Sequence, residues 1–313
     1  MPSKQKSADI CRNQFPTSTR FMKIKKIFFV FGLFIFIIAA LSMQLFSQET
    51  QNETANIKQV VENKLKNYQN ASLEKICPIE TDATAKRIFS EYGAIFVSSG
   101  TAIPAKCIFS SEAELQDYQV RAPSQTETID GNLIILQKPA MEALLKARKE
   151  AAKKNLRISP RGGALAAKRS FGDTIKLWNS RLYPGLNYWV GKGKISPKEA
   201  EKIKKAKIRD QVEKVLEWET KGWFFSKDLT KSILFSVAAP GASQHNFMLA
   251  LDVEQFASKE VRQILANNGW FQTVKSDLPH FTYLGVKENE LPTLGLKATT
   301  IGGQKFWIPN FED

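Results

Sequence analysis

The chain has 313 residues, of which 43% are hydrophobic and 24% are charged, a balance that excludes a disordered or fibrous protein and is typical of a globular one. Its formal net charge of +14 favours an anionic environment such as a cell wall or a membrane surface. We recognise no nucleic-acid-binding module in the sequence, and we therefore expect no nucleic-acid partner.

The first predicted element is a basic segment followed by a membrane-spanning one. Residues 1–26 contain seven lysines and arginines against one aspartate, and we expect this segment to stay in the cytoplasm. Residues 27–46, IFFVFGLFIFIIAALSMQLF, carry no charge and are about long enough for a helix that crosses a bilayer. Two interpretations stay open. The segment is either an uncleaved inner-membrane anchor, with the rest of the chain in the periplasm or outside the cell, or a signal peptide that is cleaved to release a secreted protein.

The exported part is predicted to have three regions. Residues 47–75 are polar and are expected to form a stalk that contributes little to a core, and residues 76–135 form an accessory part of short strands and helices. Residues 136–313 form the main domain. Cys77 and Cys107 both lie in the exported part, where oxidation is permitted, so they form either a disulfide or two buried free thiols.

The middle of the chain is predicted to be mainly helical. The sequence PAMEALLKARKEAAKK, residues 139–154, has apolar residues at helical spacing, and LRIS, residues 156–159, follows as a short strand. A second long helix is predicted over residues 196–219, because Ser196 and Glu199 form a capping box with a proline at the first helical position. We interpret its many lysines as a solvated face, and contact with an anionic polymer is the alternative interpretation.

The last third is predicted to contain short strands around one helix. The helix covers residues 258–269, with Ser258 as its N-cap. The predicted strands are ILFSVA (233–238), MLALDV (248–253), WFQTV (270–274) and HFTYLG (280–285). Because strands and helices do not alternate regularly, the pattern predicts an α+β fold with a small, mainly antiparallel sheet flanked by helices, preceded by the N-terminal transmembrane helix.

The sequence contains only two histidines, and both lie near carboxylates in this last third. His245 precedes Asp252 by seven positions, and His280 follows Asp277 by three. A catalytic zinc usually takes three protein ligands from histidine and carboxylate and keeps a fourth position for water. His245, Asp252 and His280 supply that set, and Asp277 is placed to move protons. A histidine that simply pairs with a neighbouring aspartate remains the alternative interpretation.

The residues around these positions form two recognisable signatures. The stretch SQHNFMLALD fits the pattern S-x-H, four residues, A-x-D, and DLPH fits acid-x-x-H. Both resemble signatures of the VanY-type D-alanyl-D-alanine carboxypeptidases, zinc peptidases that cut bacterial peptidoglycan. The resemblance implies that His245, Asp252 and His280 bind Zn²⁺ on one face of the sheet. It also implies that Asp277 is the catalytic acid and base and that Ser243 contacts the substrate.

The resemblance extends upstream and covers roughly residues 139–285. The segment RSFGDTIKLW is similar to an arginine-bearing family segment, which implies that Arg169 stabilises the oxyanion, an effect typically worth about 2.7–4 kcal/mol. Arg161 in SPRGG is the rival for that role. Two positions depart from the family pattern, because Met248 replaces a glycine and Asp277 replaces a glutamate.

Taken together, the resemblance implies a zinc-dependent peptidase of the bacterial cell envelope, with residues 136–313 as the peptidase domain. The implied reaction is removal of the terminal D-alanine from peptidoglycan stem peptides, and the implied partners are peptidoglycan peptides and, through the N-terminal helix, the membrane. Two alternatives stay open: an endopeptidase on the same fold, and a non-catalytic protein that only binds peptidoglycan.

Overall fold

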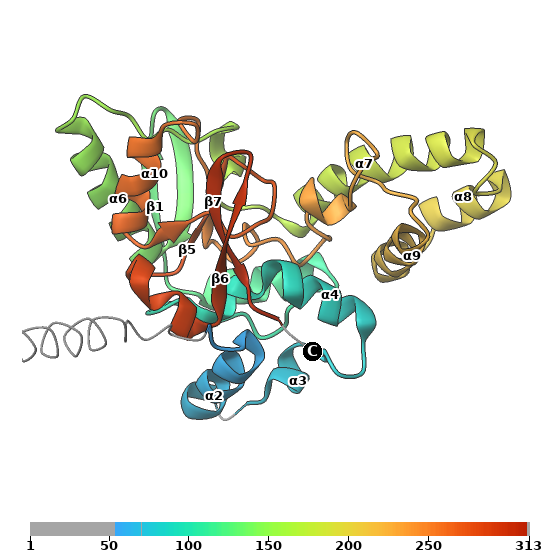
Figure 1. Ribbon diagram of the computed structural model, residues 1–313, viewed down its shortest axis with the longest axis horizontal. Coiled ribbons are helices and arrows are strands. Elements are labelled where there is room, and N and C mark those ends of the chain that lie inside the picture. Colours follow the sequence, from blue (N-terminus) through green and yellow to red (C-terminus); the bar gives the residue numbers. More distant parts are fainter. Residues whose placement is uncertain (1–53, 70, 312–313) are drawn as a thin grey trace, which may run out of the picture. The chain divides into compact units, whose positions relative to one another are not determined.

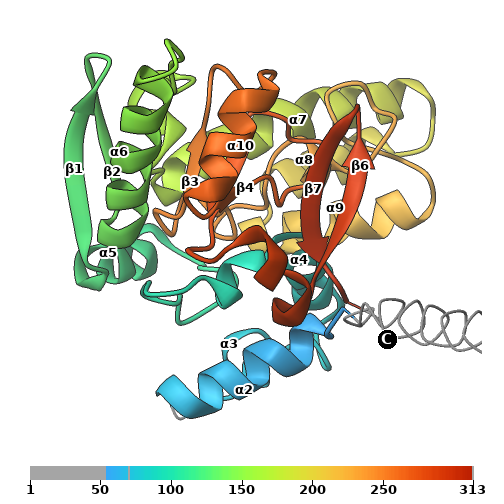
Figure 2. The same ribbon diagram turned by 60° about the vertical axis from the view of Figure 1, so that its left-hand side comes forward.

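The computed structural model describes residues 54–69 and 71–311 and shows helices mixed with short antiparallel strands (Figures 1 and 2), which confirms the predicted α+β class. The α-helices are α2 (Ile57–Gln69), α3 (Leu73–Ile76), α4 (Ala83–Tyr92), α5 (Glu112–Arg121), α6 (Lys138–Ala152), α7 (Phe171–Gly191), α8 (Pro197–Lys204), α9 (Ile208–Thr220) and α10 (Lys259–Asn267). The strands are β1 (Ser124–Ile129), β2 (Asn132–Gln137), β3 (Ala250–Asp252), β4 (Trp270–Phe271), β5 (His280–Tyr283), β6 (Leu296–Ile301) and β7 (Gln304–Pro309). Short 3-10 helices are η1 (Gly93–Val97), η2 (Gly163–Ala166), η3 (Ile233–Phe235), η4 (Glu288–Glu290) and η5 (Pro292–Leu294).

The strands form three small antiparallel sheets instead of the single small sheet that we expected. The central sheet has the order β3-β5-β4, and the hairpins β1-β2 and β6-β7 form the other two. Single backbone hydrogen bonds join the hairpins to the central region. The Gln137 N–H donates to the Met248 carbonyl at 2.9 Å, and the Trp307 N–H donates to the Gln272 carbonyl at 2.8 Å. The hairpins therefore lie against the central sheet without extending it as paired strands.

Helices α6 and α10 form where local signals predicted them. Helix α6 has Pro139 in its first turn, where the missing N–H has no intrahelical partner to lose. Helix α10 begins after Ser258, whose hydroxyl accepts a hydrogen bond from the Val261 N–H at 3.3 Å. Gly269 follows the end of α10 with φ of +78°, a conformation that glycine adopts without strain.

Two predicted elements in the middle of the chain are wrong. The long helix predicted over residues 196–219 is two helices, α8 and α9, separated by residues 205–207. The strand predicted over residues 233–238 is instead the 3-10 helix η3 and the turn after it. The buried Glu219 carboxylate accepts a hydrogen bond from the Ile233 N–H at 2.6 Å. This N–H is therefore not free to pair with a neighbouring strand.

The strand predicted over residues 156–159 is also absent, for a similar reason. The Arg148 guanidinium donates to the Ile158 carbonyl, and the Ser159 N–H donates to the Gln255 side-chain carbonyl at 2.8 Å. Side chains thus satisfy two backbone groups of this segment, and its backbone pairing is limited to its end, where the Glu254 N–H donates to the Ser159 carbonyl at 2.9 Å beside an isolated antiparallel bridge between Pro160 and Val253. Its apolar content reflects burial of Ile158 in the core and not membership of a sheet.

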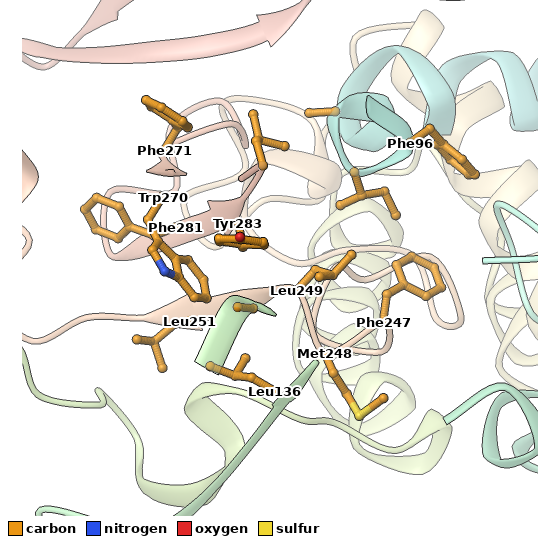
Figure 3. Packing of buried hydrophobic residues seen from close by; sticks show 14 of the residues in the cluster. Phe96, Leu136, Phe247, Met248, Leu249, Leu251, Trp270, Phe271, Phe281 and Tyr283 are labelled. Carbon is orange, nitrogen blue, oxygen red and sulfur yellow. The ribbon is translucent and has the colours of Figure 1, made fainter. Parts of the chain in front are cut away.

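The larger core surrounds the central sheet, and Figure 3 shows Leu251 of β3, Trp270 of β4 and Phe281 of β5 among its buried side chains. Ile57, Val61 and Leu65 of α2, spaced four residues apart on one helix face, are fully buried in the same core. This finding corrects our expectation for the segment 47–75, because its described part contributes to the core instead of forming a core-poor stalk.

A second core joins helices α7, α8 and α9, which lie together in Figure 1. Trp178, Leu182 and Leu186 of α7 are fully buried there, and they meet Val215 and Trp218 of α9. Because these residues recur at helical spacing, they fix which face of α7 is buried and which face remains free.

Cys77 and Cys107 form a disulfide with an S–S distance of 2.07 Å, so the disulfide alternative is confirmed for this pair. The membrane-spanning segment predicted at residues 27–46 lies outside the residues that the structure describes. Among residues 54–69 and 71–311, none of the helices combines the length and the apolar character that crossing a membrane would require.

Asp82 connects the start of α4 to α9 and provides a test of this part of the fold. Its carboxylate accepts the N–H groups of Thr84 at 2.9 Å and Ala85 at 3.0 Å, and it pairs with Arg209. Burial acts to raise the pKa of Asp82, but the Ala85 hydrogen bond, Arg209 and the Thr84 hydrogen bond together hold that pKa below its usual range. We expect Asp82→Asn, which keeps a helix cap, to lower the free energy of unfolding by about 1 kcal/mol, and Asp82→Ala by about 2 kcal/mol.

The pH dependence of the Asn variant separates the ion pair from the cap. Because the folded-state pKa of Asp82 is lowered, the advantage of the wild type is fully present above the unfolded pKa of about 3.9 and is lost as the pH falls through the folded pKa. Urea unfolding at pH 7 and pH 2 measures this difference, with Asp117→Asn in an exposed pair of α5 as the control. An equal loss at both pH values would contradict the role of the Asp82 charge.

Candidate metal centre

The loop that carries His245 is placed by a close backbone contact at Gly241. Gly241 has φ of +81°, and a Cβ atom at this position would lie 2.0 Å from the Phe109 carbonyl oxygen. The Phe109 N–H donates to the Gly241 carbonyl at 2.9 Å. Glycine is required both by the left-handed conformation and by this approach, and the contact attaches the His245 loop to the segment that follows Cys107.

The central sheet brings the other two candidate ligands together. Asp252 ends β3 and His280 begins β5, and the two residues are direct partners in the antiparallel register. The Nε2 atom of His245 lies 3.1 Å from Nδ1 of His280 and 3.3 Å from Oδ1 of Asp252. Nδ1 of His280 and Oδ1 of Asp252 are 3.4 Å apart. Two nitrogens and one oxygen thus form a nearly equilateral triangle.

This triangle has the dimensions of one face of a tetrahedral metal site. In such a site with bonds of about 2.0–2.1 Å, neighbouring ligand atoms are separated by about 3.3–3.4 Å. His245 and His280 are buried, and the Asp252 side chain is 15% exposed, so the ligand atoms are shielded from bulk water on most sides. These three residues could hold a metal ion, as the sequence pattern predicted.

The outer nitrogen of each histidine ring has a partner that orients the ring. Nδ1 of His245 lies 2.8 Å from the Ala167 carbonyl oxygen, and Nε2 of His280 lies 2.8 Å from the side-chain oxygen of Gln244. Both partners are acceptors, so each outer nitrogen carries the proton and each inner nitrogen keeps its lone pair directed at the centre. Gln244 is itself held by the Thr282 hydroxyl, which donates to the same oxygen.

Gln244 was not predicted from the sequence, and its role can be measured. We expect Gln244→Leu to weaken metal binding by about 10- to 100-fold, because the His280 ring would lose the acceptor that fixes its orientation. Chelator competition at pH 7 measures the affinity. Gln263→Leu on the exposed face of α10 is the matched control and should not change it. Equal affinities of the Gln244 variant and the control would show that packing alone orients His280.

The charges of the centre favour a neutral histidine beside an ionised carboxylate. Burial and the nearby Arg169 lower the pKa of His245 to about 4, although Asp252 opposes this shift. Burial acts to raise the pKa of Asp252, but His245, His280 and Arg169 outweigh it and hold that pKa well below its usual range. At neutral pH both groups therefore have the protonation state that metal binding requires.

Asp277 lies beside the three candidate ligands, in the turn that leads into β5. Its backbone carbonyl accepts the His280 N–H at 3.2 Å, and its side chain lines the same pocket. Burial raises the pKa of Asp277 to about 6, and the Asp252 carboxylate adds to this shift. Asp277 is thus a second, more basic carboxylate within one pocket.

The two arginines considered for oxyanion stabilisation lie in different surroundings. Arg169 lines the pocket, and its Nη2 donates to Oδ2 of Asp252 at 2.5 Å while its Nε donates to the Leu165 carbonyl at 2.9 Å. The Arg161 side chain pairs with Glu254 at 3.1 Å, is 47% exposed and does not line this pocket. Only Arg169 of the two is therefore in contact with the centre through its side chain.

The pocket has a volume of about 210 Å³, and its wall is shared between the metal centre and the second core. Ser243, which the family resemblance implies as a substrate contact, is one of the residues that line it. The wall also contains Thr174 and Leu177, which belong to the arginine-bearing segment RSFGDTIKLW, and residues that the sequence analysis did not single out: Tyr92, Arg181, Leu234, Ser236, Val237, Ala238, Gln244 and Val274. Gln244 lies inside the S-x-H pattern, but nothing in the sequence marked Arg181, which reaches the pocket from α7.

Comparison with protein-family models, with curated proteins and with solved structures found no significant match to this chain. Any functional assignment therefore depends on the geometry and chemistry of the centre. The chemistry of a site is decided by its side chains and not by the fold that carries them.

Proposed function

We propose that this chain is a zinc-dependent peptidase of the bacterial cell envelope, a D-alanyl-D-alanine carboxypeptidase acting on peptidoglycan stem peptides. The observation that carries the proposal is the triangle of His245, Asp252 and His280 ligand atoms in a pocket that also contains the carboxylate of Asp277. Three protein ligands with room for a fourth, together with a separate carboxylate, are the parts that hydrolysis by a zinc-bound water requires.

Zinc is the metal that the donor set favours. Two imidazole nitrogens and one carboxylate oxygen with tetrahedral spacing suit Zn²⁺, whereas Mg²⁺ and Ca²⁺ prefer six or more oxygen ligands. When bound, the ion supplies a water of lowered pKa and polarises the carbonyl that is attacked. The Ala167 carbonyl and Gln244 hold the two imidazoles ready for it.

Two side chains of the pocket carry out the remaining steps. Asp277 accepts the proton of the attacking water and delivers it to the amine that leaves. Arg169 orients Asp252 through Nη2, while its Nη1 makes no hydrogen bond to any described residue. This nitrogen donates to the oxyanion that develops on the scissile carbonyl, a contribution typically of about 2.7–4 kcal/mol. Arg161 takes no part in this mechanism.

The backbone conformation at Met248 supports the family resemblance, which is the basis for the proposed substrate. The VanY-type signature has glycine at this position, and Met248 has φ of +57°, the left-handed conformation that glycine adopts most easily. Met248 takes up this backbone conformation with a side chain that is fully buried and lies among the core residues of Figure 3. Replacement of the glycine is therefore compatible with an intact site.

The disulfide supports the proposed location outside the cytoplasm. Disulfides persist mainly in oxidising compartments, and the Cys77–Cys107 bond lies on the side of residues 27–46 that we expect to be exported. The proposed arrangement is an inner-membrane anchor at residues 27–46 with the peptidase in the periplasm or outside the cell, and cleavage after this segment would release the same domain.

Metal analysis combined with product analysis tests the proposal. The purified protein should bind one zinc ion and release D-alanine from a stem pentapeptide, and a chelator should stop the release until zinc is restored. Mass spectrometry of the products distinguishes removal of the last residue from cleavage within the peptide. A protein that binds no zinc, or that releases no D-alanine when fully loaded, would refute the proposed activity.

A further inference from the structure

One cation of the pocket wall, Arg181, has no part in the steps above. Its Nε donates to the Ser236 hydroxyl at 2.8 Å, and its Nη1 donates to the Ser180 hydroxyl at 2.9 Å. Its Nη2 makes no hydrogen bond to any residue in the described part of the chain, and no described carboxylate forms a salt bridge with Arg181. Two neutral hydroxyls therefore hold the guanidinium in place without neutralising it.

The packing of α7 fixes the direction of Arg181. Thr174, Leu177 and Arg181 are spaced three and four residues apart, so they lie on one helix face, and all three line the pocket. A neighbouring face carries Trp178 and Leu182, which are fully buried in the second core. The helix cannot rotate without exposing these side chains, and Arg181 is therefore held at the pocket wall.

Among the charged groups of the pocket wall, Arg181 is a cation that forms no ion pair with a described carboxylate. The titratable groups of the wall are Tyr92, Arg169, Arg181, His245, Asp252, Asp277 and His280. Asp252 is engaged by Arg169 and by both histidines, whereas no carboxylate among residues 54–69 and 71–311 pairs with Arg181. A half-buried guanidinium is stabilised by an anion, and its planar fork matches the two oxygens of a carboxylate.

We infer that Arg181 binds the free terminal carboxylate of the peptide substrate and so determines that the enzyme cuts at the end of a chain. The inference rests on the proposed function, and it assigns the recognition of the substrate terminus to α7. Since Arg181 and the metal centre line one pocket, a peptide held by its terminal carboxylate places its last peptide bond in that pocket. Ser236 and Ser180 are positioning residues that keep the guanidinium extended toward the ligand.

Paired substrates that differ only at the terminus test this assignment. The substrate is an acetylated L-lysyl-D-alanyl-D-alanine peptide with a free carboxylate, and its partner is the same peptide with a terminal amide. We expect Arg181→Met to raise KM for the free acid by about 10- to 100-fold with little change in kcat. The amide should be a poor substrate of the wild type, and the substitution should leave its turnover unchanged.

Two further variants separate recognition from folding. Arg181→Lys keeps the charge but not the fork, and it should recover part of the lost affinity. Lys176→Met removes an exposed positive charge from the same helix, outside the pocket, and should leave KM unchanged. Thermal unfolding of each variant shows whether α7 remains folded. If Arg181→Met reduces turnover of the acid and the amide equally, Arg181 has only a structural role and the inference is overturned.

Calorimetry keeps the inference testable if the protein proves inactive. Binding of both peptides to the zinc-loaded protein is measured without turnover. If the wild type binds the free acid more tightly than the amide and Arg181→Met abolishes the preference, the inference stands even though the proposed peptidase activity fails. If the wild type cleaves or binds both peptides equally well, carboxylate recognition by Arg181 is refuted whether or not the peptidase activity is present.

Discussion

Replacement of His280 by alanine will abolish zinc binding and peptidase activity while leaving the chain folded. The variant removes one of three ligand atoms that lie 3.1–3.4 Å apart, and two ligands do not hold a zinc ion at neutral pH with useful affinity. Zinc at about a thousand times its dissociation constant should raise the free energy of unfolding of the wild type by about 4 kcal/mol. The same zinc concentration should have no effect on the variant.

Urea unfolding with and without zinc measures this difference, and metal analysis reports the bound ion directly. Lys259→Ala, an exposed change at the start of α10, is the control and should keep the full zinc-dependent stabilisation. If His280→Ala retained both zinc and the stabilisation, His280 would not be a ligand, and the triangle would be a hydrogen-bonded pair of histidines beside an aspartate.

Replacement of Asp277 by asparagine will have a different effect, because Asp277 is not one of the three ligands. We expect the variant to bind zinc with nearly the wild-type affinity and to lose about 10²- to 10⁴-fold in kcat, since an amide cannot accept the proton of the attacking water. Asp277→Glu retains a carboxylate on an arm one methylene longer, and it should retain more activity than the asparagine variant.

Steady-state kinetics on zinc-loaded protein, with the zinc content measured in the same samples, tests this prediction. Asp117→Asn, which removes an exposed carboxylate from α5, is the control and should leave kcat unchanged. A variant that loses its zinc along with its activity would identify Asp277 as a ligand. One that keeps kcat within tenfold of the wild type would exclude it as the base.

The sequence was most informative where a signal is local. The Ser258 cap and the apolar spacing after it are contained within α10, and the two histidines are conspicuous because the chain has no others. The predicted ligands His245, Asp252 and His280 do lie together. Their grouping was expected from the histidine and carboxylate ligand set and from the two signatures that contain these residues, and the pairing of β3 with β5 brings Asp252 beside His280.

Features that depend on distant contacts could not be predicted in this way. The break between α8 and α9 has no proline or glycine, and the Gln211 side chain donates to the Ala206 carbonyl at 3.1 Å, near the end of α8. Gln244 matters because β5 places His280 beside it, 36 positions along the chain. Arg181 reaches the pocket only because the second core sets the rotation of α7. In each case tertiary packing determines the position of the element or side chain, and the local sequence pattern does not indicate that position.

A final consequence follows from the pairing of Asp252 with His280 across β3 and β5. These strands have three and four residues, and the third strand of the sheet, β4, has two, so few ladder hydrogen bonds define their alignment. A shift of one residue would turn the Asp252 side chain to the opposite face. An ion bound to both residues would therefore fix the register of β3 against β5. Zinc should then slow amide hydrogen exchange in β3 and β5 more than in the β6-β7 hairpin.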